Sequence, residues 1–374
     1  MAPHCPAAST LYDSLIVDIN DGELDDFTNI EAAFIISGTR TPDSLEHALQ
    51  WHHLILSDIR EKNLVDVFEK EKSAEKVFHY LHAKWLRKYV REATTLLDIK
   101  HRKEFNCVSA TILYNLTCDE LGLNTMAFET PTHVYTIFSN FGHDIMVENT
   151  TSLGFNIIVN LDNYSRYMSQ YYPENQIYNI GLHRLYAYEN SKGRKISNTE
   201  LLGLICYNQA YFSAENGKYF DAYDYVLMAQ IFNQDSRSNV KFEINLYYRH
   251  GKLLYTKNDF HSAFQIFADA YYRYPTNNDF KLNCVNSYLR NLETDWINKN
   301  WTRTVDNTYD VIDLNLLDDQ YAERTHSILS EWAFYFARNS NVKSGIQALN
   351  LIKLFAKLNR NDKNLQSIFE SNSE

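Results

Sequence analysis

Residues 105–114 have the sequence FNCVSATILY, and this stretch decides how the middle of the chain folds. A helical pattern begins at Cys107 and ends at Leu121-Gly122, a typical helix stop. Asn106 is then the natural N-cap, so Cys107 lies in the first helical turn. Because unpaired N–H groups and the helix dipole meet there, this position favours a thiolate over a thiol. Cys118 lies three turns further along nearly the same face and is most simply a core residue.

Short β-segments follow this helix. Their residues are β-branched or aromatic, and they occupy 125–129, 133–138 and 145–150. Pro131 separates the first two, and the stretch 139–142 (SNFG) separates the last two. The pattern therefore predicts a small antiparallel sheet with a hairpin.

The hairpin predicts a partner for His133. With a four-residue loop at 139–142, His133 lies opposite Glu148, with Cβ atoms about 5 Å apart. Asp144 would then lie four residues further along the strand, roughly 13 Å away. A slip of one residue would place Asn149 opposite His133 instead, and an amide can also hold a histidine. Spacing thus favours Glu148 and leaves Asn149 as the alternative.

These residues define a candidate catalytic set. Cys107 would attack, His133 would carry the proton, and Glu148 would fix the tautomer of the imidazole. The alternative is a buried cysteine at a helix start and an ordinary strand histidine. His79 and His82 lie one helical turn apart, but no third ligand is near them in sequence, which favours a solvated helix face over a metal site.

The two flanks of this region are expected to be helical. Glycine and proline together make only 17 of 374 residues, and helical patterns run from Leu24 to about Glu61 and again from Ser73. Residues 1–23 show no helical period, and 15–17 are a candidate short strand. Residues 151–195 predict a long irregular connection, and helices resume at 198.

The last part of the chain contains a repeat. Residues 217–222 (GKYFDA) and 258–263 (NDFHSA) both match the turn and second helix of a tetratricopeptide unit, and Gly251 supplies a small contact residue twelve positions before Ala263. A weaker copy lies at 332–358 around Gly345. The alternative is a set of generic helical hairpins.

Composition excludes several classes of protein. Lys and Arg total 36 against 47 Asp and Glu, a net charge of −11, which disfavours non-specific nucleic-acid binding and binding to anionic membranes. Five scattered cysteines show neither a disulfide framework nor a zinc pattern. No apolar run approaches the length of a membrane span, and the N-terminus does not resemble a signal peptide. The sequence as given predicts a soluble, cytoplasmic protein. An exported protein that does not use disulfides stays open as the alternative, because an export signal could be absent from this sequence.

The chain resembles the transglutaminase-like superfamily of papain-like cysteine enzymes. The resemblance covers roughly residues 25–290 and rests on 92–96 (EATTL), 105–110 (FNCVSA), 131–135 (PTHVY) and 147–150 (VENT). Within the superfamily it is similar to a bacterial branch in which this domain precedes tetratricopeptide repeats. Two features depart from the wider pattern: Glu148 stands where Asp is usual, and the Trp often found beside the nucleophile is absent.

The resemblance implies an α+β fold in which a helical N-terminal part and a papain-like core with a small antiparallel sheet precede an all-α repeat region. The expected parts are an N-terminal extension (1–23), the transglutaminase-like domain (24–195), tetratricopeptide-like repeats (196–305) and a C-terminal helical repeat or cap (306–374). The implied function is a thiol enzyme acting on a peptide or protein amide bond, by hydrolysis or by acyl transfer. Cys107, His133 and Glu148 would be catalytic, with Asn106 supporting the oxyanion, and no metal or organic cofactor is implied.

Two other functions stay open at this point. An inactive domain of this class, joined to repeats that recruit a protein partner, would be an interaction scaffold. A helical adaptor with no site would place Cys107 and His133 more than about 8 Å apart, beyond the reach of a catalytic pair.

Overall fold

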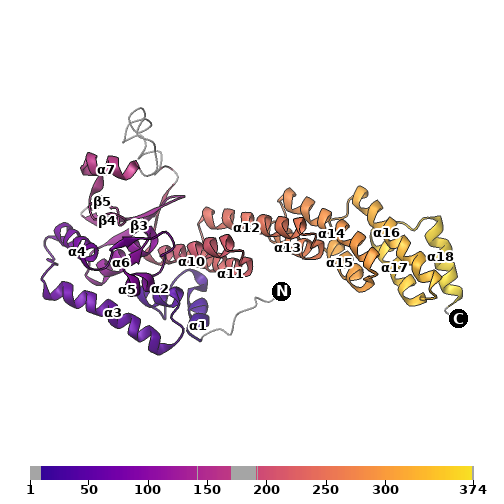
Figure 1. Cartoon of the computed structure of the whole chain (residues 1–374), viewed down its shortest axis with the longest axis horizontal. Coiled ribbons are helices and arrows are strands. Elements are labelled where there is room, and N and C mark those ends of the chain that lie inside the picture. Colours follow the sequence, from indigo (N-terminus) through magenta and orange to yellow (C-terminus); the bar gives the residue numbers. More distant parts are fainter. Residues whose placement is uncertain (1–9, 141, 170–190, 192, 373–374) are drawn as a thin grey trace. The chain divides into compact units, whose positions relative to one another are not determined.

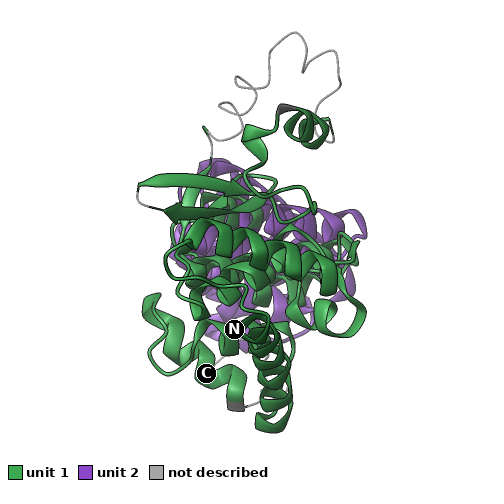
Figure 2. Cartoon of the chain, turned by 90° about the vertical axis from the view of Figure 1, so that its left-hand side faces the viewer, with its two compact units in different colours: residues 1–242 green, residues 243–374 purple. Residues whose placement is uncertain are grey.

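A computed structural model of the chain describes residues 10–140, 142–169, 191 and 193–372. Cys5 and residues 170–190 of the connection expected at 151–195 lie outside these ranges. The chain divides into two compact units, residues 1–242 and 243–374 (Figures 1 and 2). It is mostly helical, with a small antiparallel sheet in the first unit, which confirms the predicted α+β class and the helical C-terminal region.

The first unit begins with helices whose sequence signals are local. They are α1 (Thr10–Asp18), the 3₁₀ turn η1 (Ile19–Asp21), α2 (Asn29–Ser37), α3 (Pro42–Glu61), α4 (Lys70–Lys84), α5 (Leu96–Arg102) and α6 (Cys107–Glu120). Capping boxes start α2, α3, α5 and α6, and Pro42 occupies the first turn of α3. The predicted helices at 42–61 and from 107 therefore stand at the expected residues.

The first helix corrects the expectation for residues 1–23. The candidate strand at 15–17 lies inside α1, and Leu15 and Ile19 are fully buried in the core of the first unit. The Asp18 carboxylate accepts hydrogen bonds from the backbone N–H groups of residues 25–27 and so stabilises the segment between α1 and α2. A short apolar run has the same pattern in a buried strand and in a buried helix, so periodicity alone does not separate the two.

The sheet lies between helices. Its antiparallel strands are β3 (Thr125–Glu129), β4 (Val134–Asn140), β5 (His143–Val147) and β6 (Arg194–Ile196), in the order β5-β4-β3-β6. A separate parallel pair, β1 (Lys88–Tyr89) and β2 (Glu104–Phe105), precedes α6. One face of the sheet packs on α6, and the other carries η2 (Ile157–Val159) and α7 (Leu161–Met168), the latter drawn above the sheet in Figure 1.

The hairpin register differs from the prediction by two residues. Asn140 pairs with His143, and Phe138 pairs with Ile145, so the ladder continues through residues expected to form the loop. Gly142 has φ 84°, the left-handed conformation that a tight turn needs and that glycine adopts without strain. A shift of two keeps every side chain on its predicted face, because side chains alternate with a period of two.

The first unit ends with a helical hairpin that belongs to the sheet-bearing core. It consists of α10 (Asn198–Glu215) and α11 (Tyr219–Phe232). α10 packs on α2, α6 and β3, and Leu201, Leu202 and Ile205 are fully buried in the same core as α6. We expected this hairpin to be the first repeat of a separate region, but it forms one wall of the first unit.

The second unit is helical throughout its described residues. The chain enters it within α12 (Arg237–Thr256) and continues through α13 (Phe260–Arg273), α14 (Asn278–Asn298), α15 (Trp301–Asp313), α16 (Asp319–Arg338), α17 (Val342–Phe355) and α18 (Arg360–Ser371). A Cβ at Gly251 would lie 2.5 Å from the ring of Phe267, and one at Gly345 would lie 2.1 Å from that of Phe369. Both glycines therefore permit close helix contact, as expected of small residues at these positions.

Candidate active site

The start of α6 fixes the position of Cys107. Asn106 Oδ1 accepts hydrogen bonds from the N–H groups of Val108 (3.0 Å) and Ser109 (3.1 Å). Its amide nitrogen donates to the carbonyl of Arg91 (2.9 Å), which follows β1. Asn106 is therefore the N-cap, and its side chain braces the nucleophile's helix against the preceding segment. The N–H of Cys107 has no hydrogen-bond partner within the described residues, as is usual for a first helical turn.

His133 and Glu148 form the predicted pair. His133 Nε2 lies 2.7 Å from Glu148 Oε2, and their side chains are 8% and 0% exposed. The other Glu148 oxygen accepts from the N–H of Thr150 at 2.9 Å and from its hydroxyl. The Thr130 hydroxyl accepts from the N–H of His133 (3.0 Å), which holds the histidine just before β4. Each carboxylate oxygen thus has a partner, and the imidazole orientation is set from one side.

Cys107 is the third residue of the candidate catalytic set. Its thiol lies near His133, whose pKa it helps to raise, and both residues line the same cleft, while Nε2 of His133 is directed at Glu148. The structure thus brings together the three residues singled out by spacing, in the order sulfur, imidazole, carboxylate. Cys107 and His133 line one cleft, whereas an adaptor without a site was expected to keep them far apart.

The charges of the pair stabilise each other. Burial acts to lower the pKa of His133, but the negative charge of Glu148, its hydrogen bond and the nearby Cys107 outweigh burial and raise this pKa well above its usual range. For Glu148, burial acts to raise the pKa, while His133 and Thr150 lower it below its usual value. The pair is therefore an imidazolium and a carboxylate over a wide pH range.

The alternative orienting residues point elsewhere. The amide nitrogen of Asn149 donates to the hydroxyls of Thr136 (2.8 Å) and Thr111 (3.2 Å), on the side of the sheet that faces α6. Asp144 accepts from Ser139 (2.8 Å) and forms an ion pair with Lys195 near the end of the hairpin. Glu148 is therefore the carboxylate that holds His133, although the observed register does not place it directly opposite the histidine as we expected.

A glycine allows Glu148 to take this position. The N–H of Glu148 donates to the carbonyl of Gly154 (3.0 Å), so the chain folds back against the residue that follows β5. A Cβ at Gly154 would lie 1.9 Å from the Glu148 carbonyl oxygen. Only glycine fits this close backbone approach.

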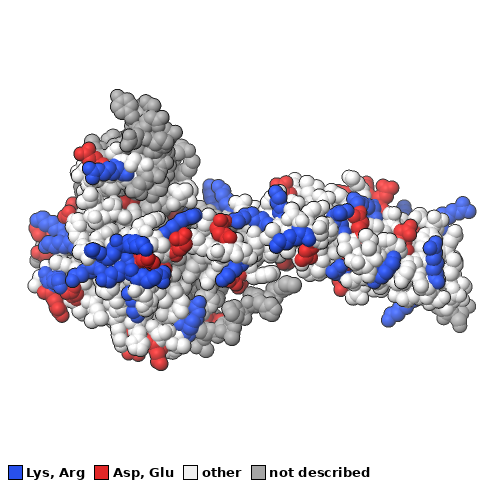
Figure 3. Space-filling model, viewed as in Figure 1, with Lys and Arg blue, Asp and Glu red and all other residues white. Residues whose placement is uncertain are grey.

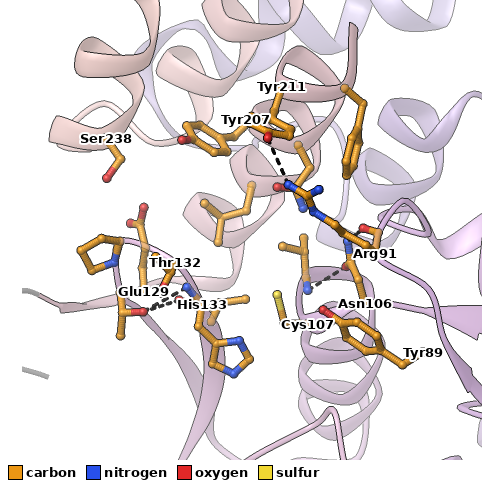
Figure 4. A pocket seen from close by; sticks show the side chains of 17 residues that line it. Tyr89, Arg91, Asn106, Cys107, Glu129, Thr132, His133, Tyr207, Tyr211 and Ser238 are labelled. Atoms are coloured by element: carbon orange, nitrogen blue, oxygen red, sulfur yellow. Dashed lines mark hydrogen bonds between the residues drawn. The ribbon is translucent and has the colours of Figure 1, made fainter. Parts of the chain in front are cut away.

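A cleft of about 370 Å³ opens onto Cys107 (Figure 4). One side contains the nucleophile and His133; the opposite wall comes from α10 and includes Leu204, Tyr207 and Tyr211. Sequence reasoning missed this wall. Tyr207 and Tyr211 are four residues apart and so share one helix face, but nothing in that spacing shows that the face turns toward the cysteine.

Arg91 also lines the cleft and was not singled out from the sequence. Its guanidinium donates to the Tyr211 hydroxyl (3.1 Å) and lies over the rings of Tyr211 and Phe212, 5.2 and 5.8 Å from their centroids. No pattern around residue 91 predicts these contacts, because their partners lie about 120 residues further along the chain.

The other described cysteines have a different environment. Cys118, Cys206 and Cys284 are buried, whereas Cys107 is partly exposed. Burial raises the pKa of Cys206 to about 12 and also raises the pKa values of Cys118 and Cys284. In the described ranges no group of three or more His, Cys, Asp or Glu side chains is arranged to hold a metal ion.

Comparison with known proteins does not identify the chain: no family model matches it, and no curated protein matches it. Among the described helices, none has the length and apolar character needed to cross a membrane.

Proposed function

We propose that the chain is a transglutaminase-like thiol enzyme that acts on a peptide or protein amide bond through a thioester. The observation that carries the proposal is a cleft lined by both Cys107 and His133, with His133 hydrogen-bonded to Glu148. A nucleophile within reach of a base, itself oriented by a carboxylate, is the arrangement that covalent acyl chemistry requires.

The fold supports the same assignment. A helix that begins with the nucleophile packs on an antiparallel sheet whose strands β4 and β5 are flanked by His133 and Glu148. This is the arrangement implied by the resemblance to papain-like enzymes. Glu148 is one methylene longer than the usual Asp, and its backbone lies one residue beyond β5, tied to Gly154. The longer side chain spans the distance from that position to the imidazole.

The proposed reaction has two halves. The Cys107 sulfur attacks the amide carbonyl as a thiolate, its proton having passed to His133, and the N–H of Cys107 donates to the developing oxyanion. His133 gives its proton to the leaving nitrogen as the C–N bond breaks, which leaves a thioester and a free amine. Water or an amine then attacks the thioester carbonyl, His133 takes the proton of this nucleophile, and the C–S bond breaks. No metal or organic cofactor takes part in these steps.

Asn106 has a positioning role in this scheme. Its oxygen caps α6, and its amide donates to the Arg91 carbonyl, so the side chain is committed to holding the helix start. We assign oxyanion stabilisation to the Cys107 N–H and the support of that N–H to Asn106.

The helical second unit is proposed to bind the protein substrate or a partner. Its helical hairpins include Gly251 and Gly345 at the close contacts typical of repeat stacks, and such stacks offer extended surfaces for polypeptides. The assignment of these hairpins to tetratricopeptide repeats rests on the motif at 258–263 and on the weaker copy around Gly345.

The experiment measures all three outcomes of amide chemistry on one unfolded protein substrate, such as denatured casein, with a fluorescent primary amine present. New amino termini report hydrolysis of the main chain, and incorporated fluorophore reports acyl transfer. Ammonia released in excess of incorporated fluorophore reports side-chain deamidation, because transfer from a side-chain amide also releases ammonia. We expect at least one signal, its loss in Cys107→Ala and its retention in Cys118→Ala. A signal that persists in Cys107→Ala contradicts the proposal. No signal from the folded wild-type protein would favour the inactive scaffold.

A further inference from the structure

Arg91 is fixed directly beside the nucleophile. Its carbonyl accepts the hydrogen bond of Asn106, the residue before Cys107. Its guanidinium is held by the Tyr211 hydroxyl and stacked on the faces of Tyr211 and Phe212. An arginine stacked in this way keeps a planar fork of N–H donors in one place, ready to bind a carboxylate.

The guanidinium of Arg91 forms no ion pair with a described residue, although the charges of Glu92 and Glu215 act on it from beyond ion-pair distance. Its side-chain contacts in the cleft are Tyr211 and Phe212. Glu129, which lines the same cleft, differs: its carboxylate accepts from Asn233 and Ser236 and lies 3.5 Å from the guanidinium of Arg194. The cleft is therefore lined by one carboxylate whose charge is already paired, that of Glu129, and by one guanidinium that can bind a ligand, that of Arg91.

The geometry of the reaction gives the two sides of the cleft different roles. The leaving nitrogen must lie near His133 because it receives the proton of that residue. The acyl part of the substrate then extends away from His133. In Figure 4 the Cys107 sulfur lies between the imidazole of His133 and the guanidinium of Arg91. Arg91 thus lies on the side that receives the acyl part.

A band of positive charge continues from this side of the cleft. Residues 84–104 include seven Lys or Arg against three Asp or Glu, in a chain whose net charge is −11, and Lys88 and Arg102 form ion pairs with Glu104 and Asp98. Lys84, Arg87, Arg102 and Lys103 are exposed, and Figure 3 shows Lys and Arg side chains gathered on the face of the first unit around α5. Such a band attracts acidic polypeptides through long-range electrostatics.

We propose that Arg91 determines specificity by binding a carboxylate in the acyl part of the substrate, so that the preferred acyl donors are acidic polypeptide segments. The inference rests on the proposed thiol chemistry at Cys107. It adds the substrate class, which neither the catalytic set nor the resemblance supplies.

The test uses two alkylating reagents of nearly equal shape, the anion iodoacetate and the neutral iodoacetamide. The rate of Cys107 labelling by each is measured by peptide mass spectrometry, and the ratio of the two rates reports the attraction for an anion at the thiol. In Arg91→Ala, which keeps the carbonyl that binds Asn106, we expect the iodoacetate-to-iodoacetamide ratio to fall about threefold or more. Arg91→Lys, which keeps the charge, should retain part of the ratio.

Lys218→Ala is the matched control. Lys218 is exposed in the turn before α11, lies outside the cleft lining and carries the same charge, so its removal should leave the ratio at the wild-type value. An unchanged ratio in Arg91→Ala, or an equal fall in both variants, overturns the role of Arg91 while leaving the proposed function standing. If neither reagent labels Cys107 faster than the buried cysteines, the proposed function falls and this inference with it.

Discussion

His133 Nε2 lies 2.7 Å from Glu148 Oε2, although both residues stand just beyond the ends of the paired strands β4 and β5. The ladder therefore does not hold the pair in register by itself. The Thr130 hydroxyl fixes the histidine, and the backbone bond to Gly154 with the Thr150 contacts fixes the glutamate. The pair is built by the turns at the strand ends, where side chains can face a cleft.

Replacing Glu148 tests the orienting role. In Glu148→Gln the charge that raises the pKa of His133 is removed, so this pKa falls and the imidazolium is lost near neutral pH. We expect the amide-directed activity to drop by about 100-fold or more, the usual scale of general acid–base catalysis. Steady-state rates and an NMR titration of His133 check both parts. Near-wild-type activity with an unaltered His133 titration would show that the carboxylate does not orient the base.

The same pair predicts how stability depends on pH. Because the folded-state pKa of His133 is raised above 6.5, the folded protein retains a proton that the unfolded chain releases, and stability is lost as the pH rises above about 6.5. The pKa of Glu148 is lowered from 4.5, so its contribution is present above that pH and is lost on acidification. The contribution of the pair should therefore be largest between about pH 4.5 and 6.5.

Denaturant unfolding at pH 5 to 9 measures this dependence. Above pH 6.5 the wild-type free energy of unfolding should fall more steeply than that of Glu148→Gln, by up to about 1.4 kcal/mol per pH unit for one proton. Parallel pH profiles for the two proteins would mean that His133 has no raised pKa.

Gly154→Ala tests the close approach behind Glu148. The new Cβ would meet the Glu148 carbonyl at 1.9 Å, so the backbone must move, at an expected cost of about 2–3 kcal/mol in unfolding free energy and with loss of activity. Gly122→Ala is the control: its φ is +72° and no atom lies within 4 Å of the added Cβ, so only about 1 kcal/mol of backbone strain is expected, with activity retained. Equal effects of the two changes would contradict the packing argument.

Asn106→Ala tests whether the N-cap serves the thiol as well as the helix. Loss of the cap should lower the unfolding free energy by about 1 kcal/mol and slow the labelling of Cys107 by iodoacetamide several-fold. Asn277 caps α14 in the same way, accepting from the N–H groups of Asp279 and Phe280. Asn277→Ala should destabilise the second unit by a similar amount and leave Cys107 labelling unaltered. A labelling rate in Asn106→Ala equal to wild type would leave Asn106 as an ordinary cap.

The parts of the site that sequence predicted depend on local chemistry. The capping preference of Asn106 predicts the start of α6. The alternation of apolar residues predicts which face each side chain of the hairpin strands lies on. These signals lie within a few residues of the features they specify. They were enough to predict that Cys107, His133 and Glu148 lie in one site.

The parts that sequence missed depend on long-range packing. The hairpin register was wrong by two residues because turn length, rather than strand pattern, decides it. Tyr211 and Arg91 meet only because α10 packs on the sheet-bearing core, and no local pattern reports that contact. The helix α1 was missed because a short apolar run fits either kind of secondary structure.

The central claim is that His133 activates Cys107, and labelling of individual cysteines at pH 7 tests it most directly. Iodoacetamide should modify Cys107 at least about ten times faster than Cys118, Cys206 or Cys284, since those thiols are buried with raised pKa values. Exposure alone would produce that order, so the deciding comparison is His133→Gln, which leaves Cys107 exposed but removes the base. If His133 activates Cys107, labelling of Cys107 slows about tenfold or more in this variant; an equal rate in wild type and His133→Gln would contradict that role.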